Sequence, residues 1–157
     1  MENIEKLVEM KNITKKFSGV TALDNISFDV RKGEVHVLLG ENGAGKSTLM
    51  KILSGAYQPT SGSINLKGKD YNQLTPKDSY ENGISIIYQE LSVINELSVQ
   101  ENLFVGKLPT RKVLGVNLVD YKKMKEVAEV LTKKVGLHRD LNIFVEELSI
   151  CEKQQLE

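Results

Sequence analysis

The sequence has 157 residues, of which 40% are apolar and 27% are charged, a composition typical of a soluble globular domain with its own core. Lysine plus arginine equal aspartate plus glutamate at 21 each, and a net charge of zero gives no support for a nucleic-acid partner. A single cysteine excludes an internal disulfide framework and suits a reducing cytoplasm. The polar first residues do not resemble a signal peptide, and no apolar run approaches the ~20 residues of a membrane span.

The first part of the chain predicts antiparallel strands followed by one buried strand. Residues 8–13 alternate weakly, which would place Val8, Met10 and Asn12 on one face of a strand and Ile13 on the other. Residues 26–30 alternate apolar and polar side chains and predict a half-buried antiparallel strand. The run Val-His-Val-Leu-Leu at 35–39 predicts a buried strand, with His36 as a packing residue.

A phosphate-binding pattern, G-x-x-x-x-G-K-[ST], follows that run directly. It consists of Gly40, Glu41, Asn42, Gly43, Ala44, Gly45, Lys46, Ser47 and Thr48. Gly43 and Gly45 allow successive backbone N–H groups to point at one anion, and the helix expected from Lys46 adds its positive end. Lys46 would bring a full charge to the β- and γ-phosphates, and the Ser47 hydroxyl would bind Mg²⁺. By itself the pattern predicts a nucleoside triphosphate site.

The next segments predict two helices and two strands. A helix after the loop carries an apolar stripe at Leu49, Ile52, Leu53 and Ala56. A strand is expected at 63–68, and Thr75 with Pro76 and Asp78 predicts the start of a short helix that ends at Gly83. The β-branched run at 84–88 predicts a buried strand, and Gln89 would lie at its carboxyl end, where open α/β sheets bind ligands.

The second half of the chain predicts mostly helix. Residues 99–103 fit one or two helical turns, and residues 108–115 read as a loop. Asp120 would cap a helix that Gly136 ends, and His138 reads as a surface residue. The apolar stripe expected on that helix is Met124, Val127, Ala128, Leu131 and Val135.

Taken together, these stretches resemble the ATP-binding subunit of an ABC transporter, and within that group the importers of simple sugars such as ribose, galactose or allose. The resemblance rests on the phosphate loop, on Tyr-Gln-Glu-Leu-Ser at 88–92 and on Leu-Ser-Ile-Cys-Glu-Lys-Gln-Gln at 148–155. It implies an α/β fold of the P-loop NTPase (ABC ATPase) type with an N-terminal antiparallel β region and a helical subdomain. The expected domains are a nucleotide-binding core at 1–90, a helical subdomain at 91–148 and the signature motif with the start of its helix at 149–157.

The resemblance also implies the roles of three further residues. Phe17 would stack on the adenine of ATP. Gln89 would contact Mg²⁺ and the attacking water, and the Gln89–Ser92 region would meet the membrane-spanning permease subunits. Ser149 would bind the γ-phosphate held by a second ATPase domain, either in tandem or in a dimer. A periplasmic or extracellular sugar-binding protein would take part indirectly, and the chain would lie peripherally on the cytoplasmic face of the membrane.

Two departures from the family pattern qualify these roles. The family usually has glycine at the position of Cys151, so a cysteine side chain there would crowd the opposing nucleotide. No run of four apolar residues followed by Asp-Glu occurs, so the catalytic base is missing and the fold would end before its Walker B strand. We therefore expect the N-terminal part of a longer protein, which binds ATP weakly at best, does not turn it over and is prone to self-association.

Two other classes stay open at this stage. One is a different P-loop enzyme, although a GTPase needs an Asn/Thr-Lys-x-Asp base reader that the sequence lacks, and kinases lack the Leu-Ser-Ile stretch. The other is a soluble ABC-type ATPase with a regulatory or ribosome-associated role. Co-purification with membrane subunits rather than with ribosomes would separate these soluble relatives from an importer.

Overall fold

The computed structural model describes residues 5–113 and 115–157. The chain divides into two compact units, Met1–Ile86 and Ile87–Glu157. Each unit has a hydrophobic core of its own. Our finer division of the chain at residues 90 and 148 stays a prediction.

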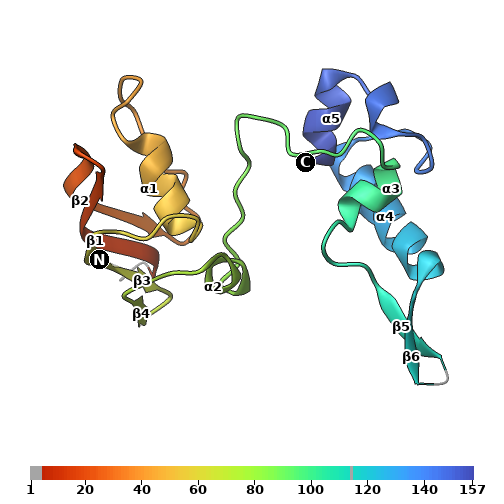
Figure 1. The fold of residues 1–157 in the computed structure, drawn as a ribbon, viewed down its shortest axis with the longest axis horizontal. Coiled ribbons are helices and arrows are strands. Elements are labelled where there is room, and N and C mark those ends of the chain that lie inside the picture. Colours follow the sequence, from red (N-terminus) through yellow and green to blue (C-terminus); the bar gives the residue numbers. More distant parts are fainter. Residues whose placement is uncertain (1–4, 114) are drawn as a thin grey trace. The chain divides into compact units, whose positions relative to one another are not determined.

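The first unit is built on a four-stranded antiparallel sheet (Figure 1). Its strands are β1 (Lys6–Phe17), β2 (Val20–Arg31), β3 (Ser61–Leu66) and β4 (Lys69–Tyr71), in the spatial order β2-β1-β3-β4. The predicted antiparallel strands are confirmed, and β1 continues to Phe17, four residues beyond the alternating run at 8–13. The central strand β1 places Met10 between Phe28 of β2 and Ile64 of β3. These cross-strand neighbours form one apolar face.

One residue pattern in β1 was predicted wrongly. Ile13 is fully buried with Met10, although strict alternation would place the two on opposite faces. Asn12 has a φ of 53°, and the pairing with β2 shifts between Met10 and Ile13. A bulge at Asn12 therefore adds one residue to the strand and returns Ile13 to the core face. The Asn12 side chain donates to Asn25 Oδ1 at 2.8 Å, which ties the bulge to β2.

Two helices complete this unit. The predicted helix after the phosphate loop is α1 (Lys46–Leu53), and its Leu49 and Ile52 pack into the core formed by the sheet. Ala56, the last residue of the expected stripe, lies beyond the helix and is exposed. The second helix, α2 (Pro76–Glu81), starts where it was predicted, because the Thr75 hydroxyl accepts from the Asp78 N–H and the Asp78 carboxylate accepts from the Thr75 N–H.

The two buried strands predicted at 35–39 and 84–88 are absent from the described residues. Both segments lack regular secondary structure, and the exposed fractions of Val35 and Leu39 are 91% and 89%. A strand exists only through ladder hydrogen bonds to a neighbour. Within the described ranges the sheet of the first unit pairs with neither segment, although Leu38 and Ile84 pack against its core without joining a strand.

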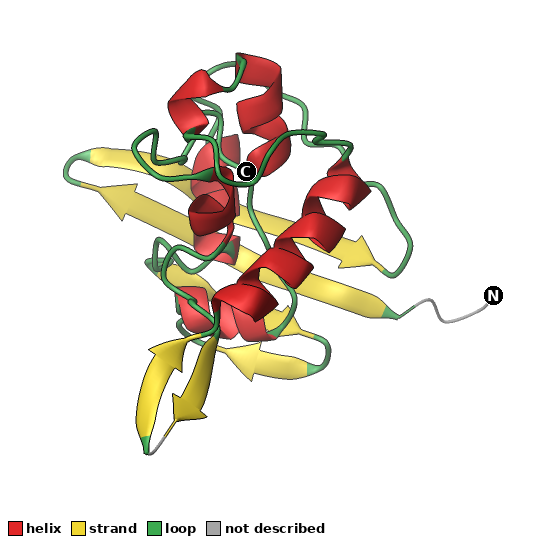
Figure 2. Cartoon of the chain, turned by 90° about the vertical axis from the view of Figure 1, so that its right-hand side faces the viewer, coloured by secondary structure: helices red, strands yellow, loops and turns green. Residues whose placement is uncertain are grey.

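The second unit is mainly helical (Figure 2). It contains α3 (Val99–Leu103), α4 (Tyr121–Val135), the 3₁₀ turn η1 (Val145–Glu147) and α5 (Ile150–Leu156). Between α3 and α4, the strands β5 (Thr110–Val113) and β6 (Val116–Val119) form an antiparallel hairpin. We predicted a loop at 108–115, so this hairpin corrects that expectation. The residues of this hairpin do not alternate regularly between apolar and polar side chains, so the sequence pattern did not predict its strands. None of the helices in the described ranges is long and apolar enough to cross a membrane.

The helix α4 begins after Asp120 and ends at Gly136, as predicted, but its buried face differs from the expected one. Met124, Ala128 and Thr132 are buried, whereas Leu131 and Val135 are exposed. The Thr132 hydroxyl donates to Ala128 O at 2.8 Å, so its polar group is satisfied inside the core. Because the hydroxyl of Thr132 is hydrogen-bonded, the buried face of α4 follows the i, i+4 positions Met124, Ala128 and Thr132 and not the broader apolar stripe that was expected.

Candidate functional site

The phosphate loop lies in the first unit and leads directly into α1. Gly45 is the N-cap of this helix with a left-handed φ of 85°, and Lys46 is its first residue. The Lys46 ammonium donates to Gly40 O at 2.6 Å and to Glu41 O at 2.7 Å. These carbonyls take up two of its three N–H donors. The lysine thus closes the loop on itself, at the end of the helix where the first-turn N–H groups are exposed.

The loop is seated against β2 at Gly45. A Cβ atom at this position would lie 2.6 Å from Ala22 O and 2.6 Å from Leu23 Cδ2, which is closer than real Cβ contacts. The first turn of α1 contains no acidic residue that would neutralise the positive end of the helix dipole. A close-packed glycine, a lysine and an uncompensated helix N-terminus together fit a bound phosphate chain.

Phe17 lies at the end of β1 and is 42% exposed. It pairs with Val20, the first residue of β2, and Ala22 two residues further along β2 is the residue that contacts Gly45. The short start of β2 therefore connects the aromatic ring to the phosphate loop. This arrangement can hold a planar ring and a phosphate chain on one unit.

The other two expected site residues belong to the second unit. Gln89 is exposed in a segment without regular structure. Ser149 is the N-cap of α5, and Cys151 is exposed in the first turn of that helix. The structure thus groups Phe17 with the phosphate loop in one unit, and Gln89 with Ser149 in the other.

Ser149 belongs to a hydrogen-bond network that sequence reasoning missed. The Glu152 carboxylate accepts from the Ser149 backbone N–H and from the Ser149 hydroxyl, both at 2.8 Å. Arg139, from the loop after α4, donates its Nε–H to the same carboxylate at 2.7 Å. The Ser149 N–H, then the Arg139 guanidinium and the Ser149 hydroxyl, lower the pKa of Glu152 to about 2. The spacing Ser-x-x-Glu is a capping-box signal, so the contact of Glu152 with Ser149 could have been predicted from the sequence. No local pattern predicts the contact of Arg139 with Glu152.

This lowered pKa predicts a pH effect. A carboxylate with a lowered folded-state pKa stabilises the protein above its ordinary pKa of 4.5, and that contribution is lost as the pH falls toward 2. Arg139→Gln is expected to raise the pKa of Glu152, so that the stabilising contribution of this carboxylate begins to be lost at a higher pH. Carboxyl carbon chemical shifts followed by NMR during acid titration measure this directly.

Lys153→Gln provides the matched control, because Lys153 lies on the same helix and donates to the Asn95 amide oxygen at 2.9 Å instead of to a carboxylate. Glu101 offers an internal comparison, since its capping box with Ser98 has no cationic partner among the described residues. An unchanged Glu152 pKa in Arg139→Gln contradicts the assignment of the arginine as a main cause.

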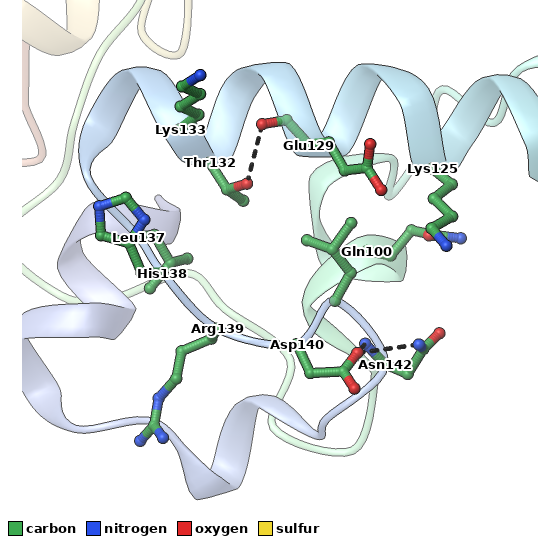
Figure 3. Close-up of a pocket in the computed structure, with 11 residues that line it drawn as sticks. Gln100, Lys125, Glu129, Thr132, Lys133, Leu137, His138, Arg139, Asp140 and Asn142 are labelled. Atoms are coloured by element: carbon green, nitrogen blue, oxygen red, sulfur yellow. Dashed lines mark hydrogen bonds between the residues drawn. The ribbon is translucent and has the colours of Figure 1, made fainter.

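A polar depression of about 440 Å³ lies in the second unit (Figure 3). It is formed by α4, by Gln100 of α3 and by the loop at 137–142. Some of the polar groups that line the depression form hydrogen bonds with one another, since the Asp140 carboxylate accepts from the backbone N–H and the side-chain amide of Asn142. None of the residues predicted to bind nucleotide lines it, so we do not assign it to the nucleotide site.

Solved structures place this fold in a known class. An ATP-binding cassette of an ABC transporter superposes on the chain with a TM-score of 0.81 and 28% sequence identity, covering 97% of this chain and 62% of that one. The ADP conformation of an ATP-binding cassette superposes with a TM-score of 0.76 and 25% identity, covering 96% and 62%. The fold is that of an ATP-binding cassette, which confirms the predicted P-loop NTPase class.

The family model described as ABC transporter matches residues 23–157, so the chain belongs to the ABC transporter family. The D-allose import ATP-binding protein AlsA of Escherichia coli is 50% identical over 150 residues, which are 96% of this chain and 29% of that protein. The galactose/methyl galactoside import ATP-binding protein MglA of Clostridium tetani is 48% identical over 151 residues, which are 96% of this chain and 30% of that protein. The chain therefore spans less than a third of the length of these relatives.

Proposed function

We propose that this chain is the ATP-binding part of the energy-coupling subunit of an ABC importer for simple sugars. The observation that carries the nucleotide role is the phosphate loop at the start of α1, where Gly45 packs against β2 and Lys46 closes the loop. The sugar class rests on the relatives, which are named as import proteins for D-allose and galactose. Which sugar is carried would be decided by the membrane and binding-protein partners.

ATP would be held mainly by the first unit. The loop residues 40–48 would surround the β- and γ-phosphates with backbone N–H groups, and Lys46 would exchange its loop carbonyls for phosphate oxygens. Phe17 would stack on the adenine. Because the ammonium already points into the loop, it needs a local rearrangement and not a new helix position to reach the phosphates.

Magnesium would accompany the nucleotide. The described residues contain no group of three or more His, Cys, Asp or Glu side chains that could hold a metal on its own. Ser47 is exposed directly after Lys46, and its hydroxyl fits a Mg²⁺ ion that takes its other ligands from phosphate and water. Gln89 would contact the ion and the attacking water. The metal would neutralise the charge of the phosphates.

The second unit would couple ATP binding to transport. The Gln89–Ser92 segment would contact the permease subunits, and Ser149 would bind the γ-phosphate of an opposing ATPase domain. In the structure the Ser149 hydroxyl donates to Glu152, so it would have to turn to reach a phosphate. The chain would work at the cytoplasmic face of the membrane, with the sugar-binding protein on the other side.

The test is ATP binding by the chain in the presence of Mg²⁺, measured by calorimetry. Lys46→Ala is expected to weaken binding about 10- to 100-fold, because charge-assisted hydrogen bonds to phosphate contribute roughly 1.5–3 kcal/mol. Lys77→Ala is the control, since Lys77 is an exposed lysine of the same unit that lies outside the phosphate loop and forms a 3.8 Å pair with Glu81. Steady-state hydrolysis of ATP is expected to be absent for the unmodified chain and for both variants. Equal affinities of Lys46→Ala and the unmodified chain would refute the proposed site.

A further inference from the structure

The Phe17 ring is in contact with two side chains that come from different parts of the first unit. Its centroid lies 5.5 Å from that of Tyr57, with the rings edge to face at 73°. The Lys15 ammonium lies 5.0 Å from the Phe17 centroid. Lys15 and Phe17 are two residues apart in β1, a spacing that places side chains on the same face of a strand. Tyr57 follows the C-terminal end of α1.

Both neighbours of Phe17 are themselves held in place. The Tyr57 N–H donates to Lys51 O at 3.0 Å, and its ring packs against the buried core. The Lys15 ammonium donates to Gln58 O at 2.7 Å and lies 5.9 Å from the Tyr57 ring. The segment that carries Tyr57 is tied to β1 again at Thr60, whose N–H donates to Thr14 O at 2.8 Å.

This arrangement restrains an otherwise exposed aromatic side chain. A phenylalanine at a strand end has two free torsions and gains little from stacking unless its ring is already oriented. Here an edge-to-face neighbour and an ammonium restrain the ring, while 42% of the residue remains exposed. The exposed surface is apolar and aromatic, which suits a flat heteroaromatic ring.

We propose that Tyr57, together with Lys15, is a positioning residue that orients Phe17 for the base of a nucleotide. This inference rests on the proposed function and deepens it at the base end of the site. Tyr57 acts through Phe17, so its loss weakens recognition of the base and leaves the interaction with the phosphates unchanged. The spacing of Lys15 and Phe17 is visible in the sequence, but the pairing of Phe17 with Tyr57 across 40 residues is not.

The experiment compares two ligands, ATP and inorganic tripolyphosphate, each with Mg²⁺, on the same chain. Tyr57→Leu is expected to weaken ATP binding about 5- to 20-fold, the lower part of the range for a lost base–aromatic stack, and to change tripolyphosphate binding less than twofold. Tyr57→Phe keeps the ring edge and is expected to bind ATP like the unmodified chain. Lys15→Met, which removes the ammonium, is expected to weaken ATP binding less than Tyr57→Leu does and to leave tripolyphosphate binding unchanged.

Tyr71→Leu is the matched control, because Tyr71 lies in the same unit and also has a lysine, Lys69, 4.8 Å from its ring centroid. If it weakens ATP binding as much as Tyr57→Leu does, the effect is general destabilisation and the inference is overturned. Equal losses for ATP and tripolyphosphate in Tyr57→Leu, or no loss for either, also overturn it. Failure of the proposed function gives a different result. In that case the unmodified chain binds neither ATP nor tripolyphosphate, or Lys46→Ala binds both with unchanged affinity.

Discussion

Gly45→Ala is expected to weaken ATP binding by this chain at least ~30-fold. The new Cβ would lie 2.6 Å from both Ala22 O and Leu23 Cδ2, and the residue would have to keep a left-handed φ of 85°. The left-handed conformation costs about 1–2 kcal/mol for a residue with a Cβ, and overpacking a close contact adds about 1–3 kcal/mol. Because the carbonyl belongs to β2, which is paired with β1, the loop has to move instead, and Lys46 loses its position relative to Gly40.

The measurement is ATP affinity by calorimetry, with an expected loss of at least ~30-fold, together with the urea midpoint of unfolding. Gly33→Ala separates the two causes, since Gly33 has a φ of 75° but no atom within 4 Å of the place that a Cβ would occupy. This control carries only the conformational cost and should keep ATP affinity within about twofold. Equal affinities for Gly45→Ala and Gly33→Ala would show that the contact with β2 does not shape the loop.

Met10→Ala is expected to produce the largest loss of stability in the first unit. Met10 has no exposed surface and lies between Phe28 and Ile64 at the centre of the sheet. Truncation of a buried methionine to alanine removes apolar contacts and leaves a cavity, at a cost of about 2–5 kcal/mol. Urea unfolding monitored by amide signals of β1 and β3 measures this change in the free energy of unfolding.

Val35→Ala is the informative control for that experiment. The sequence pattern places Val35 in a buried strand, whereas the structure leaves 91% of it exposed. The expected change in the free energy of unfolding is within about 0.5 kcal/mol, as for other surface substitutions. A loss as large as that of Met10→Ala would instead show that residues 35–39 are part of a packed sheet.

The boundaries of the helices could be predicted from the sequence because their causes are local. Thr75, Asp120 and Ser149 each accept a hydrogen bond from an N–H three residues later, and these short-range bonds depend on few other parts of the chain. The antiparallel strands followed from alternation in the same way. The phosphate loop was predictable too, since its glycines and Lys46 form their bonds within six residues.

The candidate site could be predicted in its parts but not in its contacts. The phosphate loop was expected from its motif and Phe17 from the resemblance to the ABC family, and the structure places both in the first unit. The ring of Tyr57 against Phe17, the guanidinium of Arg139 on Glu152 and the seat of Gly45 on Ala22 all join residues that are distant in sequence. No local pattern encodes such pairs.

The sequence by itself determined the family of this protein, its phosphate loop and the positions of its helix caps, since each depends on a short run of residues and on local hydrogen bonds. Only the tertiary structure decided which apolar runs become strands and which side chains support the site. The runs at 35–39 and 84–88 have the composition of strands, yet a strand needs hydrogen-bonding neighbours. Asn12 likewise looks like an ordinary strand residue, and only its pairing with β2 turns it into the bulge that buries Ile13.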